Sequence, residues 1–250
     1  MSPTFRARPK PFLDTARRDW QFDAFAWLLR HCGGYPKFLE TVPVLPVEQH
    51  FPDRGMSGHA GAAALFRRVR DHAGMADWPC MVEPRSDAES SGANCASITA
   101  DRIRVIYYDP AQRKPAVLVA RFARELARYL VETFEEPAPG GAPFQEPATD
   151  IATVFMGFGV FVANASLESG AWDLNEGELA HALAMFCLLR KAAPDGLEPH
   201  LSPHLRKYLR LATLDLAQYE DRFQRLRGMP LAALKARAAE PAPRNCRGGS

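Results

Sequence analysis

The chain has 250 residues, of which 47% are hydrophobic, and this is enough apolar material to form the core of one substantial domain. Lys and Arg number 31 against 29 Asp and Glu, so the formal net charge is only +2. A charge this close to balance does not indicate the broad basic surface that nucleic-acid-binding proteins present, and we expect no nucleic-acid partner.

Cysteine usage and hydropathy predict a cytoplasmic protein. The first 20 residues contain several Arg and Lys but lack the apolar segment of a secretory signal. The longest apolar run, residues 151–163, is shorter than the roughly 20 residues that cross a bilayer, so we expect no membrane span. Five cysteines are scattered along the chain without a C-x-x-C pair, as is typical of reduced thiols: Cys32, Cys80, Cys95, Cys187 and Cys246.

The first third of the chain predicts two helices. Residues 1–18 are basic and contain proline, and we expect a mobile N-terminal arm there. Apolar residues recur at helical spacing over 19–31 and again over 60–72, and each run ends near glycine. The prolines of 42–53 predict an extended or looped segment between these helices.

The rest of the chain predicts a small sheet followed by helices. Residues 80–84 and 103–108 have the composition of strands, and 86–94 read as a polar loop between them. Helices are predicted over 115–134, 147–165, 175–190 and 202–226, with a Pro- and Gly-rich loop over 135–147. The sequence therefore predicts one helix-dominated α+β domain over 19–235, with a disordered tail over 236–250.

Two segments carry motifs: Arg121-Phe-Ala-Arg-Glu-Leu-Ala-Arg-Tyr-Leu130, and Glu146-Pro-Ala-Thr-Asp150 with the glycine-containing apolar run behind it. Together they resemble a bacterial family of zincin-type metallopeptidases, in which an H-E-x-x-H helix precedes an E-P-x-T-D helix. The likeness covers roughly residues 40–215. It implies a zincin-like domain with a small β-sheet.

The resemblance also implies which residues occupy the former zinc site. In such a site two histidines at i and i+4 bind zinc, and the Glu after the first is the general base. Here Arg124 and Arg128 stand at the two metal-ligand positions, and Glu125 stands at the general-base position. A guanidinium has no acceptor lone pair and cannot coordinate a cation. We therefore expect a degenerate site that has lost its zinc and needs no cofactor.

The position of the third ligand stays open between Glu146 and Asp150, whose E-x-x-x-D spacing is that of gluzincins. Pro147 disfavours helix at the preceding residue, so we expect Glu146 at the N-cap and Asp150 one turn inside the helix. We further expect Arg124 and Arg128 each to pair with one or more of Glu125, Glu146 and Asp150, because guanidinium groups bind carboxylates with parallel hydrogen bonds.

An ordinary surface helix would show the same pattern. Leu118, Phe122 and Leu126 lie on one apolar face of the predicted 115–134 helix. The opposite face consists of charged residues, namely Arg121, Arg124, Glu125, Arg128 and Glu132. Sequence alone leaves open whether this face lines a vestigial cleft or is merely solvated.

Several histidines are weaker candidates. His50 and His59 flank an acidic, glycine-containing loop. His200 and His204 have the i,i+4 spacing of a helical metal pair, although Pro203 stands between them. His181 lies among leucines, and we expect a semi-buried, hydrogen-bonded imidazole there.

The remaining candidates are thiols and basic residues. Cys80 and Cys95 could each form a nucleophile pair with a histidine, whereas Cys187 lies in an apolar helix and is expected to be inert. The basic residues near the C-terminus are expected to form a solvated face: Arg206, Lys207, Arg210, Arg222, Arg225 and Arg227.

Three functional hypotheses follow. The first is a pseudo-metallopeptidase, a non-catalytic binding or regulatory module whose vestigial cleft accepts a peptide, a protein partner or an anion. The second is a hydrolase that uses a relocated metal site or a thiol. The third is a structural subunit without a ligand.

Overall fold

The computed structural model describes residues 11–52, 57–85, 96–99, 103–111, 114–168 and 172–230. These residues form a helix-dominated α+β fold with one small sheet, as the sequence predicts. The predicted 86–94 loop, the 236–250 tail and residues 1–10 of the predicted arm lie outside the described residues.

The first helix, α1 (Thr15–His31), begins four residues earlier than the predicted start at 19. Asp14 is its N-cap, and the Asp14 carboxylate accepts a hydrogen bond of 2.9 Å from the backbone N–H of Arg17. Arg18 is buried and donates to the hydroxyl of Tyr219 at 2.6 Å. The expectation of a mobile arm as far as residue 18 is therefore wrong for residues 15–18.

A short helix follows that the sequence did not predict. Gly33 and Gly34 end the regular part of α1, but their positive φ values let the chain turn and form α2 (Gly34–Phe38). Next come α3 (Gly58–His72) and the strand β1 (Cys80–Pro84), both close to their predicted ranges.

The sheet has three strands in the order β1-β3-β2. The central strand β3 (Arg104–Tyr108) pairs in parallel with β1, Cys80 lying opposite Arg104. The edge strand β2 (Ala96–Ile98) pairs with β3 in antiparallel orientation and was not predicted. It is too short for an alternating pattern to show in the sequence.

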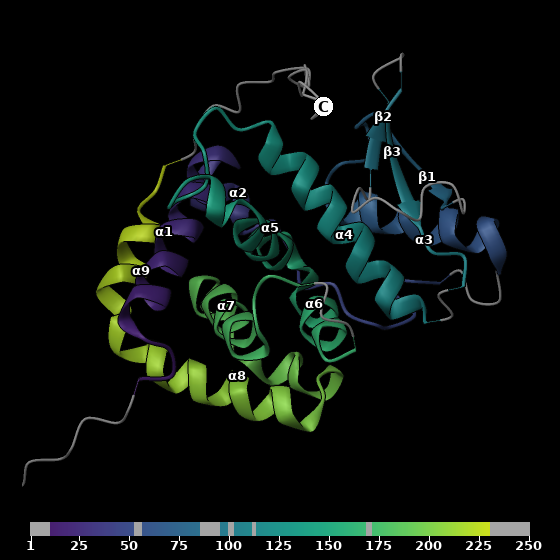
Figure 1. The fold of residues 1–250 in the computed structure, drawn as a ribbon. Coiled ribbons are helices and arrows are strands. Elements are labelled where there is room, and N and C mark those ends of the chain that lie inside the picture. The colour runs from purple at the N-terminus through teal and green to yellow at the C-terminus, as the bar shows by residue number, and fades with distance from the viewer. Residues whose placement is uncertain are drawn as a thin grey trace, which may run out of the picture.

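The long helix α4 (Pro115–Glu132) runs between the sheet with α3 on one side and the remaining helices on the other (Figure 1). It packs against α3 and β3 on one side and against α5 (Gln145–Thr153) and α6 (Gly159–Ser166) on the other. Phe122, Ala123 and Leu126 of its predicted apolar face are buried in the hydrophobic core.

The predicted 147–165 helix is interrupted. A π-helical turn over Val154–Phe158 separates α5 from α6, and Gly157 within it has a φ of 95°. The Gly157 carbonyl accepts a hydrogen bond of 2.9 Å from the N–H of Val44, so the predicted looped segment crosses the chain at this kink. A β-carbon at Gly157 would lie 2.4 Å from the Val42 carbonyl oxygen, so the crossing depends on glycine.

By length and composition, the helical stretch Ala142–Ser166 could cross a membrane, but 94% of its apolar window is buried inside the molecule. This burial fits the core helix of a soluble protein. The stretch is long because it combines four consecutive elements, namely the short helix Ala142–Phe144, α5, the π-helical turn and α6.

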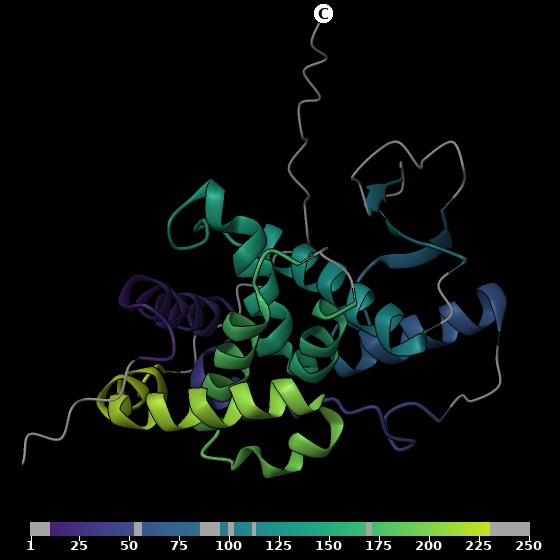
Figure 2. The same ribbon diagram turned by 60° about the horizontal axis from the view of Figure 1, so that its bottom comes forward.

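The C-terminal helices close the other side of the core. The helix α7 (Glu176–Leu189) begins with a capping box between Asn175 and Glu178 and packs along α8 (Pro203–Leu216), as Figure 2 shows. The predicted 202–226 helix is divided by a 3₁₀ turn at Ala217–Tyr219 into α8 and α9 (Glu220–Arg227).

Candidate functional site

The side chains of Arg124 and Arg128 project from α4 toward the first turns of α5. Residues four apart share one helix face, so both guanidinium groups reach the same neighbouring helix. Their side chains are only 12% and 18% exposed, and Glu125 between them is 6% exposed. The alternative of a merely solvated charged face is therefore wrong for these three residues. Arg121 is exposed, and Glu132 forms an ion pair of 2.7 Å with Arg104 of β3.

Arg124 binds the carboxylate that lies deepest in the molecule. Its Nε donates to Oδ1 of Asp150 at 2.6 Å, and the Asp150 side chain is 0% exposed. Its Nη2 lies 2.5 Å from Oδ2 of Asp173 and 3.3 Å from Oε2 of Glu146. Arg124 thereby connects α4, α5 and the loop that precedes α7.

Arg128 binds one further carboxylate, that of Glu125, and shares Glu146 with Arg124. Its Nη1 donates to Oε1 of Glu125 at 2.5 Å, and its Nη2 donates to Oε2 of Glu146 at 2.6 Å. The pairing of both arginines with Glu125, Glu146 and Asp150, expected from the sequence, is thus present in the structure. We call these five residues together with Asp173 the arginine–carboxylate cluster.

Glu146 lies inside α5 rather than at its N-cap. The helix begins at Gln145 and Phe144 is the N-cap residue, so the predicted position of Glu146 is wrong by two residues. Pro147 remains within the first turn, where its missing N–H has no helical partner to lose. Glu146 and Asp150 consequently lie one turn apart on the same helix, and both reach Arg124.

Asp150 is also bound by the loop before α7. Its Oδ2 accepts hydrogen bonds from the backbone N–H groups of Asp173 at 2.8 Å and of Leu174 at 3.0 Å. No sequence pattern points to these residues, because two of the contacts are made by main-chain amides and Asp173 lies 49 positions from Arg124. A carboxylate so placed fixes three segments of the chain relative to one another.

Burial and charge act in opposite directions within the cluster. Burial raises the pKa of Asp150, against the lowering effects of Arg124 and the two backbone donors. Burial lowers the pKa of Arg124, but the charge and hydrogen bond of Asp150 and the charge of Glu146 together outweigh it and hold that pKa above its usual range. The pKa of Arg128 is likewise raised, since Glu125 and Glu146 outweigh its burial. The guanidinium groups therefore stay charged.

The cluster holds two guanidinium groups against four carboxylates, because Asp173 joins the three expected acids. One carboxylate oxygen, Oε2 of Glu125, is buried without a hydrogen-bond partner. The two guanidinium groups offer only N–H donors and have no lone pair with which to coordinate a metal ion. This arrangement holds α4 to α5 through ion pairs from both arginines.

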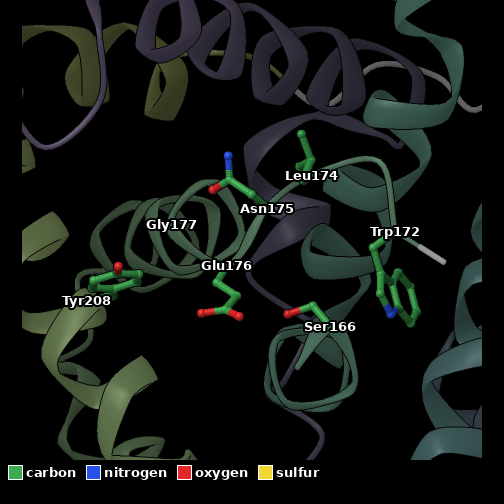
Figure 3. Close-up of a pocket in the computed structure, with 7 residues that line it drawn as sticks. All are labelled: Ser166, Trp172, Leu174, Asn175, Glu176, Gly177 and Tyr208. Atoms are coloured by element: carbon green, nitrogen blue, oxygen red, sulfur yellow. The ribbon is translucent and has the colours of Figure 1, made fainter. Parts of the chain in front are cut away.

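A pocket of about 370 Å³ opens beside the cluster (Figure 3). The loop that precedes α7 forms part of its wall, because Trp172 and Leu174, which flank Asp173 in sequence, line the pocket. The Cζ of Arg124 lies 5.5 Å from the centre of the Trp172 ring. The other residues that line the pocket are Ser166, Asn175, Glu176, Gly177 and Tyr208.

The two histidine pairs considered from the sequence, His200 with His204 and His50 with His59, do not form metal sites in the structure. His200 ends a 3₁₀ turn, whereas His204 lies in α8 and contacts Glu176 at 3.0 Å, so the two are not on one helix. His50 accepts from the N–H of Leu45 at 2.7 Å, while His59 lies 3.4 Å from the hydroxyl of Tyr108. Among the residues that the structure describes, no three His, Cys, Asp or Glu residues are grouped as metal ligands.

His181 is hydrogen-bonded as expected, but it is completely buried rather than semi-buried. Its Nδ1 lies 2.7 Å from Oε1 of Gln21, and Nε2 of that Gln21 donates to the carbonyl of Glu178 at 2.9 Å. The Gln21 oxygen must therefore accept, so Nδ1 of His181 carries the proton. Burial, with a smaller effect of Arg18, lowers the pKa of His181 to about 3.

The described thiols lack the features of nucleophiles. Burial raises the pKa of Cys80, and it raises the pKa of Cys32 and of Cys187 to about 12, whereas a reactive cysteine needs a lowered pKa. Cys187 is buried, in agreement with its predicted inert role. Cys95 lies outside the described residues.

Two of the basic residues expected on a solvated face have structural roles instead. Arg227 is 12% exposed, and its Nη2 donates to the carbonyl of Leu188 at 2.7 Å near the end of α7. Arg222 pairs with Asp19 of α1, and its Cζ lies 4.0 Å from the ring centre of Phe22. These contacts attach α9 to the core, which the charge pattern alone did not indicate.

Comparison with known proteins finds no matching family model, no similar curated protein and no similar solved structure for this chain.

Proposed function

We propose that this chain is a non-catalytic zincin-like protein, which acts as a binding or regulatory module through the remains of an active-site cleft. The observation that carries the proposal is the arginine–carboxylate cluster. Residues at the two metal-ligand positions of the motif bind the residues at its general-base and third-ligand positions.

The chemistry of the cluster supports a role in holding rather than in catalysis. A zinc ion with two neutral histidines presents a charge of about +2 to the surrounding carboxylates, and two arginines present the same charge. Guanidinium groups also match carboxylates in geometry, so they can fix α4 to α5 as a metal would. A guanidinium does not lower the pKa of a bound water, and the hydrolytic step is lost.

The neighbouring pocket supports a binding role. Small-molecule and peptide sites are concave and combine apolar walls with a few polar groups, and the pocket beside Trp172 has this composition. Because the loop that forms one wall is held by Asp150, the cluster positions the pocket. The cleft is thus proposed to retain a ligand while lacking a catalyst.

The first test is metal content and cleavage. Protein purified from a zinc-replete host should contain far less than one zinc per chain by elemental analysis. It should also cleave casein and peptide libraries no faster than a Glu125→Gln variant does. Stoichiometric zinc, or chelator-sensitive cleavage above that background, would refute the proposal.

A second test restores the histidines. The variant Arg124→His/Arg128→His should bind zinc, with Glu146 or Asp150 as an additional ligand, and a chromophoric chelator measures its affinity in competition. The matched control is Arg67→His/Asp71→His, which places an exposed i,i+4 pair on α3. We expect the restored site to bind at least about tenfold more tightly than the control, since it adds a carboxylate. Equal affinities would show that α4 and α5 do not retain a metal-site geometry.

A further inference from the structure

The pocket beside the arginine–carboxylate cluster has one charged lining residue among its seven described ones, and this residue is Glu176. Its carboxylate is 35% exposed. In the close-up of Figure 3, Glu176 lies between Tyr208 and Ser166, and Trp172 lies on the far side of Ser166. The other described lining residues are uncharged, so Glu176 supplies the only charge among them.

The aromatic rings that line the pocket also favour a positively charged ligand. The faces of indole and phenol rings attract cations, most strongly for tryptophan, and a carboxylate near such rings adds a counter-charge. Trp172 already lies near one cation of this protein, the guanidinium of Arg124. Tyr208 lies against His204, with 4.2 Å between the ring centres.

The N-terminus of α7 does not reverse the preference of the pocket for a cation. Helix N-termini attract anions, but the first turn of α7 carries Glu176 and Glu178. The capping box occupies the N–H of Asn175 with Glu178 Oε2 at 3.0 Å, and the N–H of Glu178 with Asn175 Oδ1 at 3.0 Å. An anion placed here would face the carboxylate of Glu176, whereas a cation would be attracted to it.

We infer that this pocket binds a small organic ammonium group, with Glu176 as its counter-charge and Trp172 and Tyr208 as its aromatic walls. The inference rests on the proposed function, since it names the ligand class of the same cleft. A volume of about 370 Å³ admits a ligand of few heavy atoms rather than a folded partner. Any ligand of this class competes with His204, whose Nε2 lies 3.0 Å from Oε2 of Glu176.

Choline is a suitable probe, because a neutral alcohol exists in which a quaternary carbon replaces its nitrogen. Both compounds have the same shape, so their difference isolates the charge. Calorimetric titration of the full chain should give a dissociation constant at least about tenfold lower for choline than for the neutral alcohol. Propionate, a small anion, should not bind.

Two variants test the role of Glu176 and its partner His204, and a third serves as a control. Glu176→Gln keeps the size of the side chain and leaves the capping box intact, and it should weaken choline binding about tenfold or more. Glu40→Gln, which removes an exposed carboxylate from another part of the chain, should leave binding unchanged. His204→Ala should strengthen binding, because it removes the competing partner of Glu176.

Equal affinity for choline and its neutral analogue, no binding of choline, or preferential binding of propionate would each overturn the inference. So would a Glu176→Gln variant that binds choline as well as the unmodified protein does. These results are distinct from a failure of the proposed function, because zinc content and peptide cleavage are measured without choline.

Discussion

Asp150 is the residue on which the candidate site depends most. Its side chain is fully buried and is held by the Arg124 side chain and by two backbone amides. A buried ion pair that loses one partner leaves an uncompensated charge in the core, which costs on the order of 3 to 5 kcal/mol. Glu146, by contrast, is 47% exposed, so the carboxylate side of its ion pair with Arg128 is in contact with water.

A pair of double-mutant cycles tests this difference. The cycle between Arg124→Ala and Asp150→Ala should give a large coupling energy, roughly 2 kcal/mol or more in urea unfolding. The cycle between Arg128→Ala and Glu146→Ala should give about 0 to 1 kcal/mol, because exposed pairs are screened. Similar coupling in both cycles would contradict the special role of Asp150.

At the same scale, sequence reasoning brought together five residues of the arginine–carboxylate cluster but missed the sixth. Arg124, Glu125 and Arg128 were predictable because helical spacing puts them on one face, and the motif pointed to Glu146 and Asp150. Asp173 could not be found in this way. Its contact depends on where the chain lies after α6, and the accompanying bonds to Asp150 come from backbone amides that every residue has.

At the scale of elements, the chain crossing at Gly157 is the feature most sensitive to a single atom. Gly157 has a φ of 95°, and its missing β-carbon leaves room for the Val42 carbonyl. Gly157→Ala should therefore destabilise the protein by at least about 2 kcal/mol, from backbone strain and from the displaced crossing. Thermal or urea unfolding measures the effect.

Gly196→Ala is the control for this substitution. Gly196 lies in a 3₁₀ turn without a positive φ, and an added β-carbon would meet nothing within 4 Å. We expect a change within about 0.5 kcal/mol there. Equal destabilisation by the two substitutions would show that the crossing does not depend on the glycine.

Helix and strand ranges with a clear apolar period were predicted well, and the departures have local physical causes. The positions of β1, α3, α4 and α7 follow from apolar periodicity and composition, with Pro115 marking the start of α4. The interruption of the 147–165 helix could not be predicted from the sequence. This run is apolar on all sides, so it has no amphipathic period that a kink would break. A chain crossing made by residues 42–44 causes it.

At the scale of the whole molecule, a hydrogen bond between His181 and Gln21 joins α7 to α1 inside the core. The pKa of this histidine is lowered to about 3, whereas an unfolded chain would protonate it near 6.5. The unfolded state therefore binds more protons between these two values. The contribution to stability is fully present above pH 6.5 and is lost as the pH falls toward 3.

Between pH 7.5 and pH 5, His181 should reduce the free energy of unfolding by about 2 kcal/mol. Urea unfolding at both pH values measures the change. The variant His181→Asn keeps a side-chain donor for Gln21 but does not titrate, so its stability should fall correspondingly less over the same interval. An identical fall in both proteins would place the pH dependence elsewhere.

The three donors of Asp150 have a consequence for the order in which a nascent chain can mature on the ribosome. Arg124 emerges before Asp150, but the amides of Asp173 and Leu174 emerge only after the whole of α6. Until then the carboxylate lacks two of its hydrogen bonds and burying it is costly, so α4 and α5 cannot close completely around it. Docking of the loop before α7 is thus the step that completes the contacts between α4 and α5 in the arginine–carboxylate cluster.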